Sequence, residues 1–281
     1  MKILVYGAGV LGSLLAVQLH EAGHDVELLA RGERLAALRR HGVQVADGNS
    51  PVVRAIPVPV VEWPGDGYDL IAVLVRTHQV DAVLESVADV RGDVLLLLNW
   101  AGGAVDTSGR VLLGFPAQGG TMDGDVVRRR VPGPLIRRIP MLIGEADGRT
   151  TPRVERIVGV LRTAGIAAKA EPRMDAWLAT HAAFEVPLGR AVHAAGGPEA
   201  LARDPAAVRA MLHQLRRQLA DLPTPIVPRG FAALRTLPEW LLVPVLRRFL
   251  RSSVAVQSGL SNTSPAVTGE YDRLAQQLRD R

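Results

Sequence analysis

Cysteine is absent from the 281 residues of this chain, and lysine is nearly absent. Without cysteine there can be no disulfide and no thiolate chemistry, which is typical of a cytoplasmic protein. The N-terminus enters an apolar run at once and lacks the long apolar region and small-residue cleavage site of a signal peptide. We therefore expect a cytoplasmic protein.

No apolar run is long enough to span a membrane. The most apolar late segment, "LPEWLLVPVLRRFL", is interrupted by Pro238 and Pro244 and closed by Arg247 and Arg248, which is too short and too broken for a bilayer span. We expect no membrane association. The apolar residues of this segment could form the face of a homodimer or simply the core of a second domain.

The basic character of the chain comes from arginine, because Lys2 and Lys169 are the only lysines, and the net charge is +5. No recognisable nucleic-acid module accompanies this charge. The clusters Arg128–Arg130 and Arg137–Arg138 flank "VPGP", which favours an exposed hairpin within residues 126–143. We therefore predict no nucleic-acid partner. We also predict no metal, since no group of His, Asp and Glu has metal-ligand spacing.

In the first half, short apolar runs alternate with stretches of helical periodicity. "KILVY", "DVELLA", "DLIAVLV" and "DVLLLLN" read as buried strands, with helix-like segments between them. Continuous apolar strands separated by helices are the signature of a parallel sheet covered on both faces. The prediction is an α/β fold with a doubly wound, mostly parallel sheet, extended by "RVLLGF", the hairpin candidate 126–143 and residues 166–170.

The pattern changes near Glu171. The remaining chain reads as helices over 173–195, 198–221, 230–251 and 267–280, separated by segments rich in Gly and Pro. We therefore place a domain boundary there. Residues 1–171 are predicted to form a Rossmann-type dinucleotide-binding domain, and residues 172–281 an all-helical second domain.

"GAGVLG" places Gly7, Gly9 and Gly12 in the G-x-G-x-x-G spacing, with Val10 and Leu11 between the last two glycines. The motif follows a predicted strand and opens a predicted helix, as the dinucleotide fingerprint requires. The glycines allow a tight turn, close approach of a pyrophosphate and close helix–strand packing, and helix-end amides would bind the diphosphate. The alternative is a tight turn without a ligand.

Arg31 stands at the expected tip of the second strand, where an NAD enzyme usually carries an acid. A guanidinium matches a 2′-phosphate in charge and geometry, so we predict NADPH. Arg34 could assist and Glu33 could reach a ribose, whereas Glu27 lies inside the strand. The alternative is that Arg31 is an ordinary solvated arginine.

Polar residues follow two further strands. Arg76, Thr77, His78 and Gln79 follow "LIAVLV", and Asn99 follows four leucines. Ligands of open α/β sheets bind beyond the carboxyl ends of strands, so both groups of residues are candidate ligand contacts. Asn99 could equally be a turn former.

With these motifs the chain resembles the ketopantoate reductase family, which reduces 2-dehydropantoate with NADPH. The resemblance rests on "GAGVLGSLLA", Arg31, "RTHQVDA", "LLNWAGG" and the helix led by Trp177. It implies a Rossmann domain, a helical second domain and an active site in the cleft between them.

Residue by residue, the resemblance assigns Gly7, Gly9 and Gly12 to the diphosphate and Arg31 to the 2′-phosphate. Arg76 takes the place of a lysine near the cofactor, and Gln79 matches the glutamine that follows it. Asn99 matches an asparagine near the nicotinamide and the substrate, although Trp100 replaces the glycine that follows it in the family.

The chain departs from the family where catalysis is concerned. The family's catalytic lysine corresponds to Ala179, and an asparagine four residues later corresponds to Ala183. The family's C-terminal segment has no clear counterpart in residues 251–274. The resemblance therefore implies a divergent branch of the family whose substrate the sequence does not identify.

His181 is the candidate proton donor. Trp177, His181 and Glu185 fall on one stripe of the predicted helix, and a histidine titrates near neutrality, with Glu185 available to orient it. The alternative is a core histidine bonded to Glu185 or the backbone. His78 is a second candidate that its helix would turn toward solvent.

These residues support three hypotheses. The first is an NADPH-dependent oxidoreductase of a small 2-oxo acid or related carbonyl compound, with Asn99 and His181 at the reacting carbonyl. The second is a non-catalytic NADP(H)-binding sensor or assembly protein, favoured by the missing lysine. The third is a basic nucleic-acid-binding module.

Overall fold

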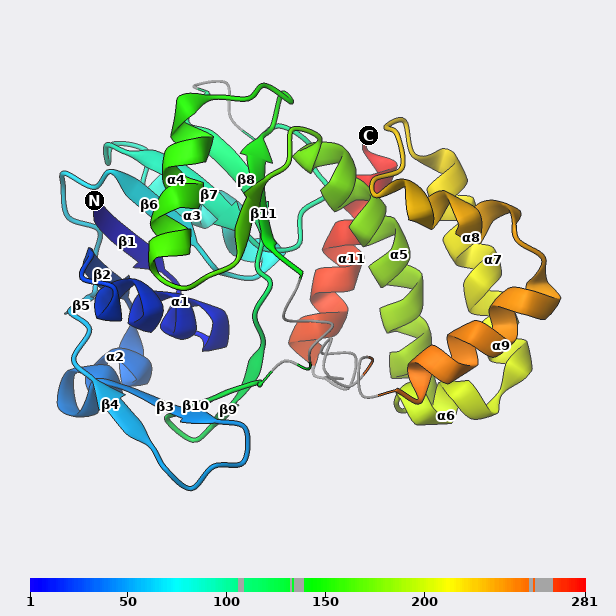
Figure 1. The fold of residues 1–281 in the computed structure, drawn as a ribbon, viewed down its shortest axis with the longest axis horizontal. Coiled ribbons are helices and arrows are strands. Elements are labelled where there is room, and N and C mark those ends of the chain that lie inside the picture. Colours follow the sequence, from blue (N-terminus) through cyan, green and yellow to red (C-terminus); the bar gives the residue numbers. More distant parts are fainter. Residues whose placement is uncertain (106–108, 132, 134–138, 253–254, 256–264) are drawn as a thin grey trace. The chain divides into compact units, whose positions relative to one another are not determined.

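The computed structural model describes residues 1–105, 109–131, 133, 139–252, 255 and 265–281 (Figure 1). Contacts divide the chain into two compact units. The sheet unit comprises Met1–Leu98 and Val105–Met174, and the helical unit comprises Asn99–Ala104 and Asp175–Arg281. The sequence expectation placed all of residues 1–171 in one domain, whereas the segment Asn99–Ala104 packs with the helices.

An eight-stranded sheet forms the centre of the sheet unit, in the order β12-β11-β8-β7-β6-β1-β2-β5. Neighbouring strands are parallel except β8 and β11, which are antiparallel. The predicted fold class, a mostly parallel α/β sheet followed by helices, is confirmed. The strands are β1 (Lys2–Tyr6), β2 (Asp25–Leu29), β5 (Val60–Val61), β6 (Leu70–Val73), β7 (Asp93–Leu97), β8 (Val111–Phe115), β11 (Met141–Glu145) and β12 (Ala168–Ala170).

Helices cover this sheet because its strands are apolar on both faces. α1 (Val10–Glu21) and α4 (Pro152–Thr163) pack on the face that carries Ile3 and Val5, in one continuous core. Tyr6 alternates with Val5 and points to the other face. There it accepts a 3.1 Å hydrogen bond from Ser86 of α3 (Val80–Ser86), which follows the short helix η1 (Thr77–Gln79). The sheet is therefore doubly wound.

A second sheet has four strands in the order β4-β3-β10-β9. Its strand β3 directly follows the helix α2 (Gly32–His41). Its strands are β3 (Val43–Asp47), β4 (Arg54–Ile56), β9 (Gly120–Asp123) and β10 (Val126–Arg129). The predicted hairpin over 126–143 is wrong. β10 pairs with β9 through a two-residue Gly124-Asp125 turn and with β3 in parallel, whereas β11 pairs with β8. Arg137 and Arg138 lie outside the described residues.

The helical unit contains α6 (Pro198–Arg203), α7 (Pro205–Asp221), η3 (Arg229–Ala232), α8 (Ala233–Thr236), α9 (Glu239–Leu250) and α11 (Pro265–Arg279), preceded by α5 (Met174–Ala195). The helix predicted over 198–221 is broken at Asp204. Its carboxylate accepts hydrogen bonds from the amides of Ala206 and Ala207 and so caps α7. The helix predicted over 230–251 is interrupted before Pro238, because proline cannot continue the hydrogen bonding of α8.

α5 is the central helix of this unit. A Cβ added at its Gly189 would lie 2.2 Å from the ring of Tyr271 in α11, so the glycine lets the two helices approach closely. Leu188 and Val192 join side chains of α6, α7 and α9 in one apolar core. Among the described residues, no helix combines the length and the apolar character that crossing a membrane requires.

Candidate functional site

β1 is the point at which the order of strands changes direction. The chain continues from β1 to β2 on one side, and β6 lies on the other side. Tyr6 is in register with Leu29 of β2 and with Val73 of β6, so the three strands end at the same level. A crevice outside the carboxyl ends of strands at such a switch point is where α/β proteins bind ligands.

The glycine-rich turn begins directly after β1. Gly7 has a φ of +115°, and a Cβ there would lie 2.5 Å from the Leu74 carbonyl oxygen that follows β6. A Cβ at Gly12 would lie 1.8 Å from the carbonyl oxygen of Gly7. Both positions therefore require glycine for the packing of the protein itself.

Gly9 differs from the other two glycines. It is exposed, and a Cβ added to it would meet no atom within 4 Å. Its φ of −74° is accessible to any residue. The protein's own packing does not require glycine here, but a ligand that approaches the backbone would.

Gly9 is also the residue from which α1 starts, and the first turn of α1 carries no acidic side chain. Helix N-termini carry amides without intrahelical partners and a partial positive charge. The smooth surface at Gly9 and these amides fit a diphosphate. The cradle formed by Gly7–Gly12, which includes Val10 and Leu11, thus fits a dinucleotide.

Arg31 is exposed at the tip of β2, where it precedes α2. Its Nη2 donates a 2.8 Å hydrogen bond to the Tyr6 hydroxyl, and its guanidinium lies 5.0 Å from the ring centroid of Trp63. Among the described residues, Arg31 forms no ion pair with a carboxylate. It is therefore a positioned cation at the carboxyl edge of the sheet rather than an arginine surrounded only by water.

Arg34 forms hydrogen bonds that tie the glycine-rich turn to the β9–β10 hairpin. It donates to the Ala8 carbonyl at 3.2 Å and to the Asp125 carbonyl at 3.0 Å, and it lies 3.4 Å from Ser13 Oγ. Burial lowers the pKa of Arg34, although the nearby Asp125 carboxylate acts in the opposite direction. These contacts direct its guanidinium at the turn and at the β9–β10 hairpin.

The residues after β6 form a tight turn. Gln79 Oε1 accepts a 3.0 Å hydrogen bond from the amide of Arg76, and the amide of Gln79 donates 2.8 Å to the Arg76 carbonyl. Arg76 is half-buried, and His78 is exposed, as its predicted place at the start of a helix implied. Gln79 thus orders the backbone at the carboxyl end of β6.

Asn99 follows β7 and belongs to the segment Asn99–Ala104 of the helical unit. That segment is held by α11 and the residues after it, because the Ala101 amide donates 3.0 Å to Gln277 Oε1 and Arg281 donates to the Ala101 carbonyl. Trp100 is buried and donates 2.9 Å to the Gly103 carbonyl. Asn99 is therefore fixed in the same unit as α5.

Three side chains of α5 form a continuous stripe. The Trp177 and His181 rings stack with centroids 5.1 Å apart and an interplanar angle of 7°. His181 Nε2 lies 2.9 Å from Glu185 Oε2 one turn later. The His181 and Glu185 side chains are 25% and 23% exposed, so neither is sealed in the core.

Ala179 and Ala183 occupy another face of α5. Both are fully buried, and Ala183 packs with Leu215 and Leu219 of α7. Residues 179 and 181 differ by about 200° around a helix axis, since each residue adds about 100°. A group on His181 therefore leaves the helix in a different direction from one at position 179.

Neither lysine of the chain lies at the carboxyl edge of the sheet. Lys2 starts β1 at the opposite end and donates 3.2 Å to the Asp66 carbonyl, and Lys169 is exposed on the edge strand β12. In the part of the chain that the structure describes, His, Asp and Glu form no group of three that could hold a metal ion.

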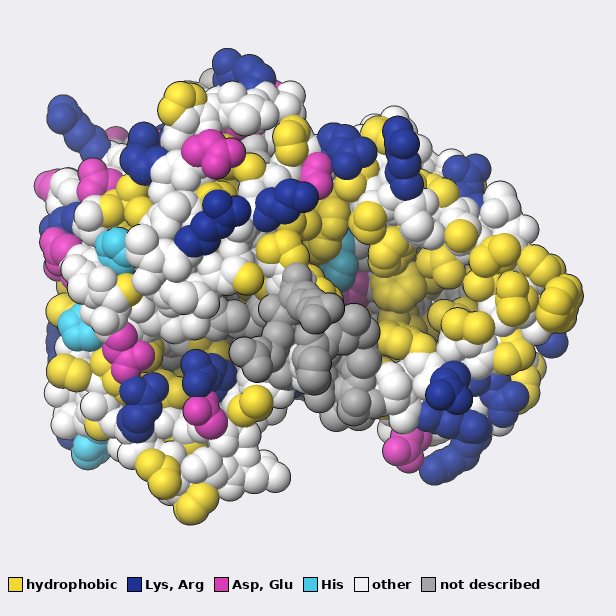
Figure 2. Space-filling model, in the orientation of Figure 1, with side chains coloured by type: hydrophobic (Ala, Val, Ile, Leu, Met, Phe, Trp, Pro, Cys, Tyr) yellow, Lys and Arg dark blue, Asp and Glu magenta, His cyan; other side chains and the backbone are white. Residues whose placement is uncertain are grey.

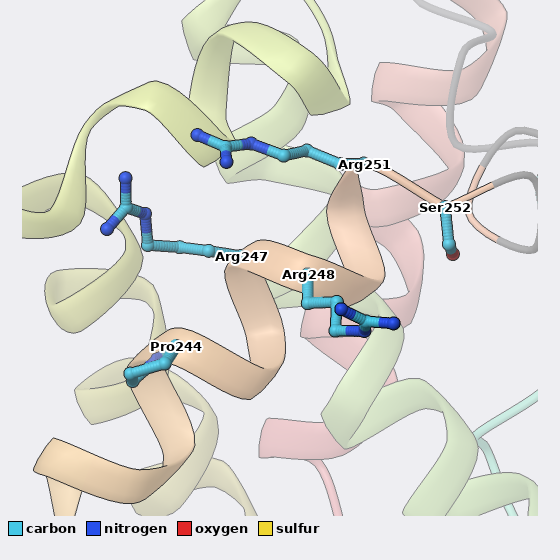
Figure 3. Close-up of a pocket in the computed structure, with 5 residues that line it drawn as sticks. All are labelled: Pro244, Arg247, Arg248, Arg251 and Ser252. Atoms are coloured by element: carbon cyan, nitrogen blue, oxygen red, sulfur yellow. The ribbon is translucent and has the colours of Figure 1, made fainter.

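A hollow on the helical unit is lined by Pro244, Arg247, Arg248, Arg251 and Ser252 (Figure 3). Arg247 and Arg251 both donate to the Ala202 carbonyl, at 2.8 and 3.3 Å. Ala202 lies in the last turn of α6, where carbonyls lack intrahelical partners. These two arginines therefore cap α6, which explains their clustering without a ligand.

The arginines of β10 are paired with acids. Arg128 lies 2.7 Å from Asp123 Oδ2, and Arg129 lies 2.7 Å from Asp47 Oδ1. Burial lowers the pKa of Arg130. The cluster therefore does not present three unpaired cations to a phosphate backbone.

Two residues of the candidate site were not found from the sequence. Tyr6 and Trp63 hold Arg31 from two sides. Tyr6 could have been found as a hydrogen-bonding aromatic at the last position of the first strand. Trp63 lies in an irregular segment after β5, and no sequence pattern connects it with Arg31.

Comparison with known proteins gives consistent relatives. Residues 3–111 match the family described as ketopantoate reductase PanE/ApbA. The chain is 29% identical over 175 residues to a 2-dehydropantoate 2-reductase of Archaeoglobus fulgidus, covering 60% of this chain and 55% of the relative. It is 29% identical over 128 residues to that of Pyrococcus horikoshii, covering 46% and 42%. It thus spans about half the length of these curated relatives.

Solved structures resemble the chain over its whole length. A 2-dehydropantoate 2-reductase from Geobacter metallireducens GS-15 has a TM-score of 0.66 at 16% identity, with 100% of this chain and 99% of that chain covered. D-mandelate dehydrogenase with NADH and anilino(oxo)acetate has a TM-score of 0.68 at 15% identity, with the same coverage of each. At such identities these likenesses show a shared fold.

Proposed function

We propose that this chain, whose residues 3–111 match the family described as ketopantoate reductase PanE/ApbA, is an NADPH-dependent reductase of a small 2-oxo acid. The observation that carries the proposal is the cradle Gly7–Gly12 at the switch point of the sheet, with Arg31 at the tip of the adjacent strand. Relatives named 2-dehydropantoate 2-reductase and D-mandelate dehydrogenase support a 2-oxo acid as substrate class.

Arg31 is the basis for proposing NADPH rather than NADH. The fork of a guanidinium suits a phosphate, and Tyr6 and Trp63 orient it. The mandelate dehydrogenase structures contain NADH, so the two cofactors must be compared directly. We expect Arg31→Met to weaken NADPH binding at least 10-fold and to leave NADH binding within about 3-fold, since a charged contact contributes about 1.5–3 kcal/mol.

The nicotinamide cofactor, when bound, supplies the hydride. The chain's own residues must orient the substrate carbonyl and provide the proton that balances the developing oxyanion. We propose that Asn99 donates a hydrogen bond to the carbonyl oxygen and that His181 delivers the proton. Both residues belong to the helical unit, and the stack with Trp177 and the contact with Glu185 hold the His181 ring in one orientation.

The first test compares the wild type with His181→Ala in NADPH oxidation, using ketopantoate and a panel of aliphatic and aryl 2-oxo acids. We expect turnover of at least one 2-oxo acid by the wild type. The variant should lose about 100-fold or more in kcat, the size of a general-acid contribution, and keep its affinity for NADPH. Equal kcat values would remove His181 from the mechanism.

A non-catalytic NADP(H)-binding protein is the second candidate. The observation that favours it is the buried Ala179, which the resemblance places where the family has its catalytic lysine. Tight NADPH binding with no reduction of any member of the panel would establish this candidate. Both lysines of the chain belong to the sheet unit, Lys2 at the start of β1 and Lys169 on the edge strand β12.

We further propose that α9 provides the face of a homodimer. Leu237, Trp240, Leu241 and Val245 are exposed by 38%, 77%, 38% and 55%, and Figure 2 shows hydrophobic side chains gathered over this part of the helical unit. Contiguous exposed apolar surface marks interaction sites. A dimeric mass in sedimentation that becomes monomeric in Trp240→Arg would support this face, and a monomeric wild type would contradict it.

A further inference from the structure

Trp63 is a large aromatic side chain that the protein does not bury. It is 66% exposed, although an indole is among the side chains that gain most from burial. Trp63 contributes no side chain to the core of the sheet unit. Because α/β proteins bind ligands beyond the carboxyl ends of their strands, an indole exposed there is available to stack on one.

Backbone pairing fixes the place of Trp63. β5 lies beside β2 with Leu29 opposite Val61, and the Ala30 amide donates 3.0 Å to the Val61 carbonyl. Arg31 follows Ala30 and Trp63 closely follows Val61, so both residues emerge at the same end of two adjacent strands. The Arg31 guanidinium lies 5.0 Å from the centroid of the Trp63 ring, within cation–π range.

Tyr6 holds Arg31 from the other side. The Tyr6 hydroxyl accepts from Arg31 Nη2 at 2.8 Å, and the Arg31 guanidinium lies 5.9 Å from the centroid of the Tyr6 ring. Ser86 of α3 donates 3.1 Å to the same hydroxyl. Arg31 is thus held between two aromatic rings, one of them anchored to the sheet and the other open to solvent.

The direction of a dinucleotide on the cradle decides what reaches Trp63. With the diphosphate at Gly9, the adenosine half of a dinucleotide extends over the end of β2. The groups that arrive there are a ribose and a flat purine base. A purine stacks on an exposed aromatic face with a contribution of about 1–3 kcal/mol per base.

We propose that Trp63 forms the adenine subsite by stacking its indole on the purine base, and that it positions Arg31 for the adjacent ribose phosphate. The inference rests on the proposed function, because it assumes that a nicotinamide dinucleotide occupies the cradle. It adds a base-recognition residue outside the glycine-rich turn. Recognition of the adenosine 2′-phosphate half is then shared by two neighbouring strand ends, with Trp63 contacting the base and Arg31 contacting the phosphate.

The test uses 2′,5′-ADP, which carries the adenine and the 2′-phosphate without a nicotinamide, and reduced nicotinamide mononucleotide, which carries the other half. By calorimetry, Trp63→Ala should weaken 2′,5′-ADP and NADPH about 10-fold and leave the mononucleotide unchanged. Trp63→Phe should bind 2′,5′-ADP within about 3-fold of the wild type, because a phenyl ring also stacks.

Fluorescence gives a readout independent of affinity. The chain has four tryptophans, and stacking on a base quenches the indole involved. 2′,5′-ADP should quench the wild type but not Trp63→Phe. The matched control is Trp240→Phe, which removes another exposed indole, in the helical unit, and should keep the quenching.

The outcomes separate the two proposals. If the wild type binds NADPH but Trp63→Ala binds 2′,5′-ADP equally well, the adenine subsite is wrong and the proposed function stands. Quenching that persists in Trp63→Phe would also overturn it. If the wild type binds neither NADPH nor NADH, the proposed function fails and the subsite fails with it.

Discussion

The His181 imidazole lies parallel to the Trp177 indole, with ring centroids 5.1 Å apart. On the other side of the same ring, Glu185 Oε2 lies 2.9 Å from Nε2. The three residues are spaced by four along α5 and therefore lie on one helix face. Trp177 stacks on the His181 ring, and Glu185 is its acidic neighbour. This arrangement restricts the directions in which His181 can exchange a proton.

Glu185→Gln should therefore affect turnover without affecting cofactor affinity. The amide can still contact Nε2, but it replaces the carboxylate that orients the ring, so we expect kcat to fall several-fold. Steady-state kinetics with calorimetry of NADPH binding checks this. Glu199→Gln is the control, because Glu199 forms an exposed contact with Arg203 at 3.6 Å on α6 and its loss should change nothing.

Gly9→Ala and Gly12→Ala should distinguish a clash with a bound ligand from a clash within the protein itself. At Gly9 the added methyl meets no protein atom within 4 Å, whereas at Gly12 it meets the Gly7 carbonyl at 1.8 Å. We expect Gly9→Ala to keep its Tm within about 2 °C and to lose NADPH affinity at least 10-fold, since the methyl group would stand where the diphosphate approaches.

Gly12→Ala should instead lower the Tm by several degrees before any ligand is added, because the turn must shift by more than 1 Å. Thermal melting with and without NADPH measures both effects. Equal melting temperatures for the two variants would contradict the geometry of the turn.

The Glu145–Arg153 pair should make the sheet unit sensitive to acid. Glu145 is buried at the end of β11. Burial acts to raise its pKa, but hydrogen bonds from Arg153 and Thr151 prevail and hold that pKa below its ordinary value. A carboxylate with a lowered pKa in the folded state stabilises the fold above the unfolded pKa, near 4.5, and this contribution is lost as the pH falls further.

Arg153→Met should remove most of this contribution. Arg153 also lies 3.0 Å from Asp93 of β7 and donates 2.7 Å to the Gly109 carbonyl. Breaking a buried pair leaves an uncompensated charge that costs about 3 kcal/mol. Urea unfolding should therefore show a loss near that size at pH 7. The difference from the wild type should shrink as the pH falls through the lowered folded-state pKa of Glu145.

Gln277→Ala should affect the reaction through the segment Asn99–Ala104. Gln277 Oε1 accepts from the Ala101 amide, so its loss releases the backbone next to Trp100. If Asn99 orients the carbonyl, kcat should fall several-fold with NADPH affinity unchanged. The control is Gln276→Ala, because the Gln276 amide contacts the exposed Asp280 instead.

The parallel sheet could be predicted because its signal is local. Each of β1, β2, β6 and β7 is a short apolar run bounded by polar residues, and the glycine spacing after β1 identifies the turn. Strands of parallel sheets are buried on both faces, so the continuous apolar character and the short length of such runs are sufficient to identify them.

Pairing partners could not be predicted in the same way. Strand β10 was expected to pair forward with residues near 141, but it pairs back with β9 and with the distant β3. The "GD" of Gly124-Asp125 is a two-residue hairpin signal that the sequence contained. The contact between Trp63 and Arg31 joins two irregular positions, and no periodicity reveals such a contact.

The assignment of Asn99–Ala104 to the helical unit has a consequence for cutting the chain. A polypeptide ending at Met174 would contain this segment without Gln277 and Arg281, its two anchors. Trp100, which is 5% exposed in the whole chain, would lose the contacts that bury it. A fragment that starts at Asp175 would in turn lack Ala101, the backbone partner of its Gln277 and Arg281. The two halves are therefore interlocked along the chain, and neither is a self-sufficient module for domain exchange or separate expression.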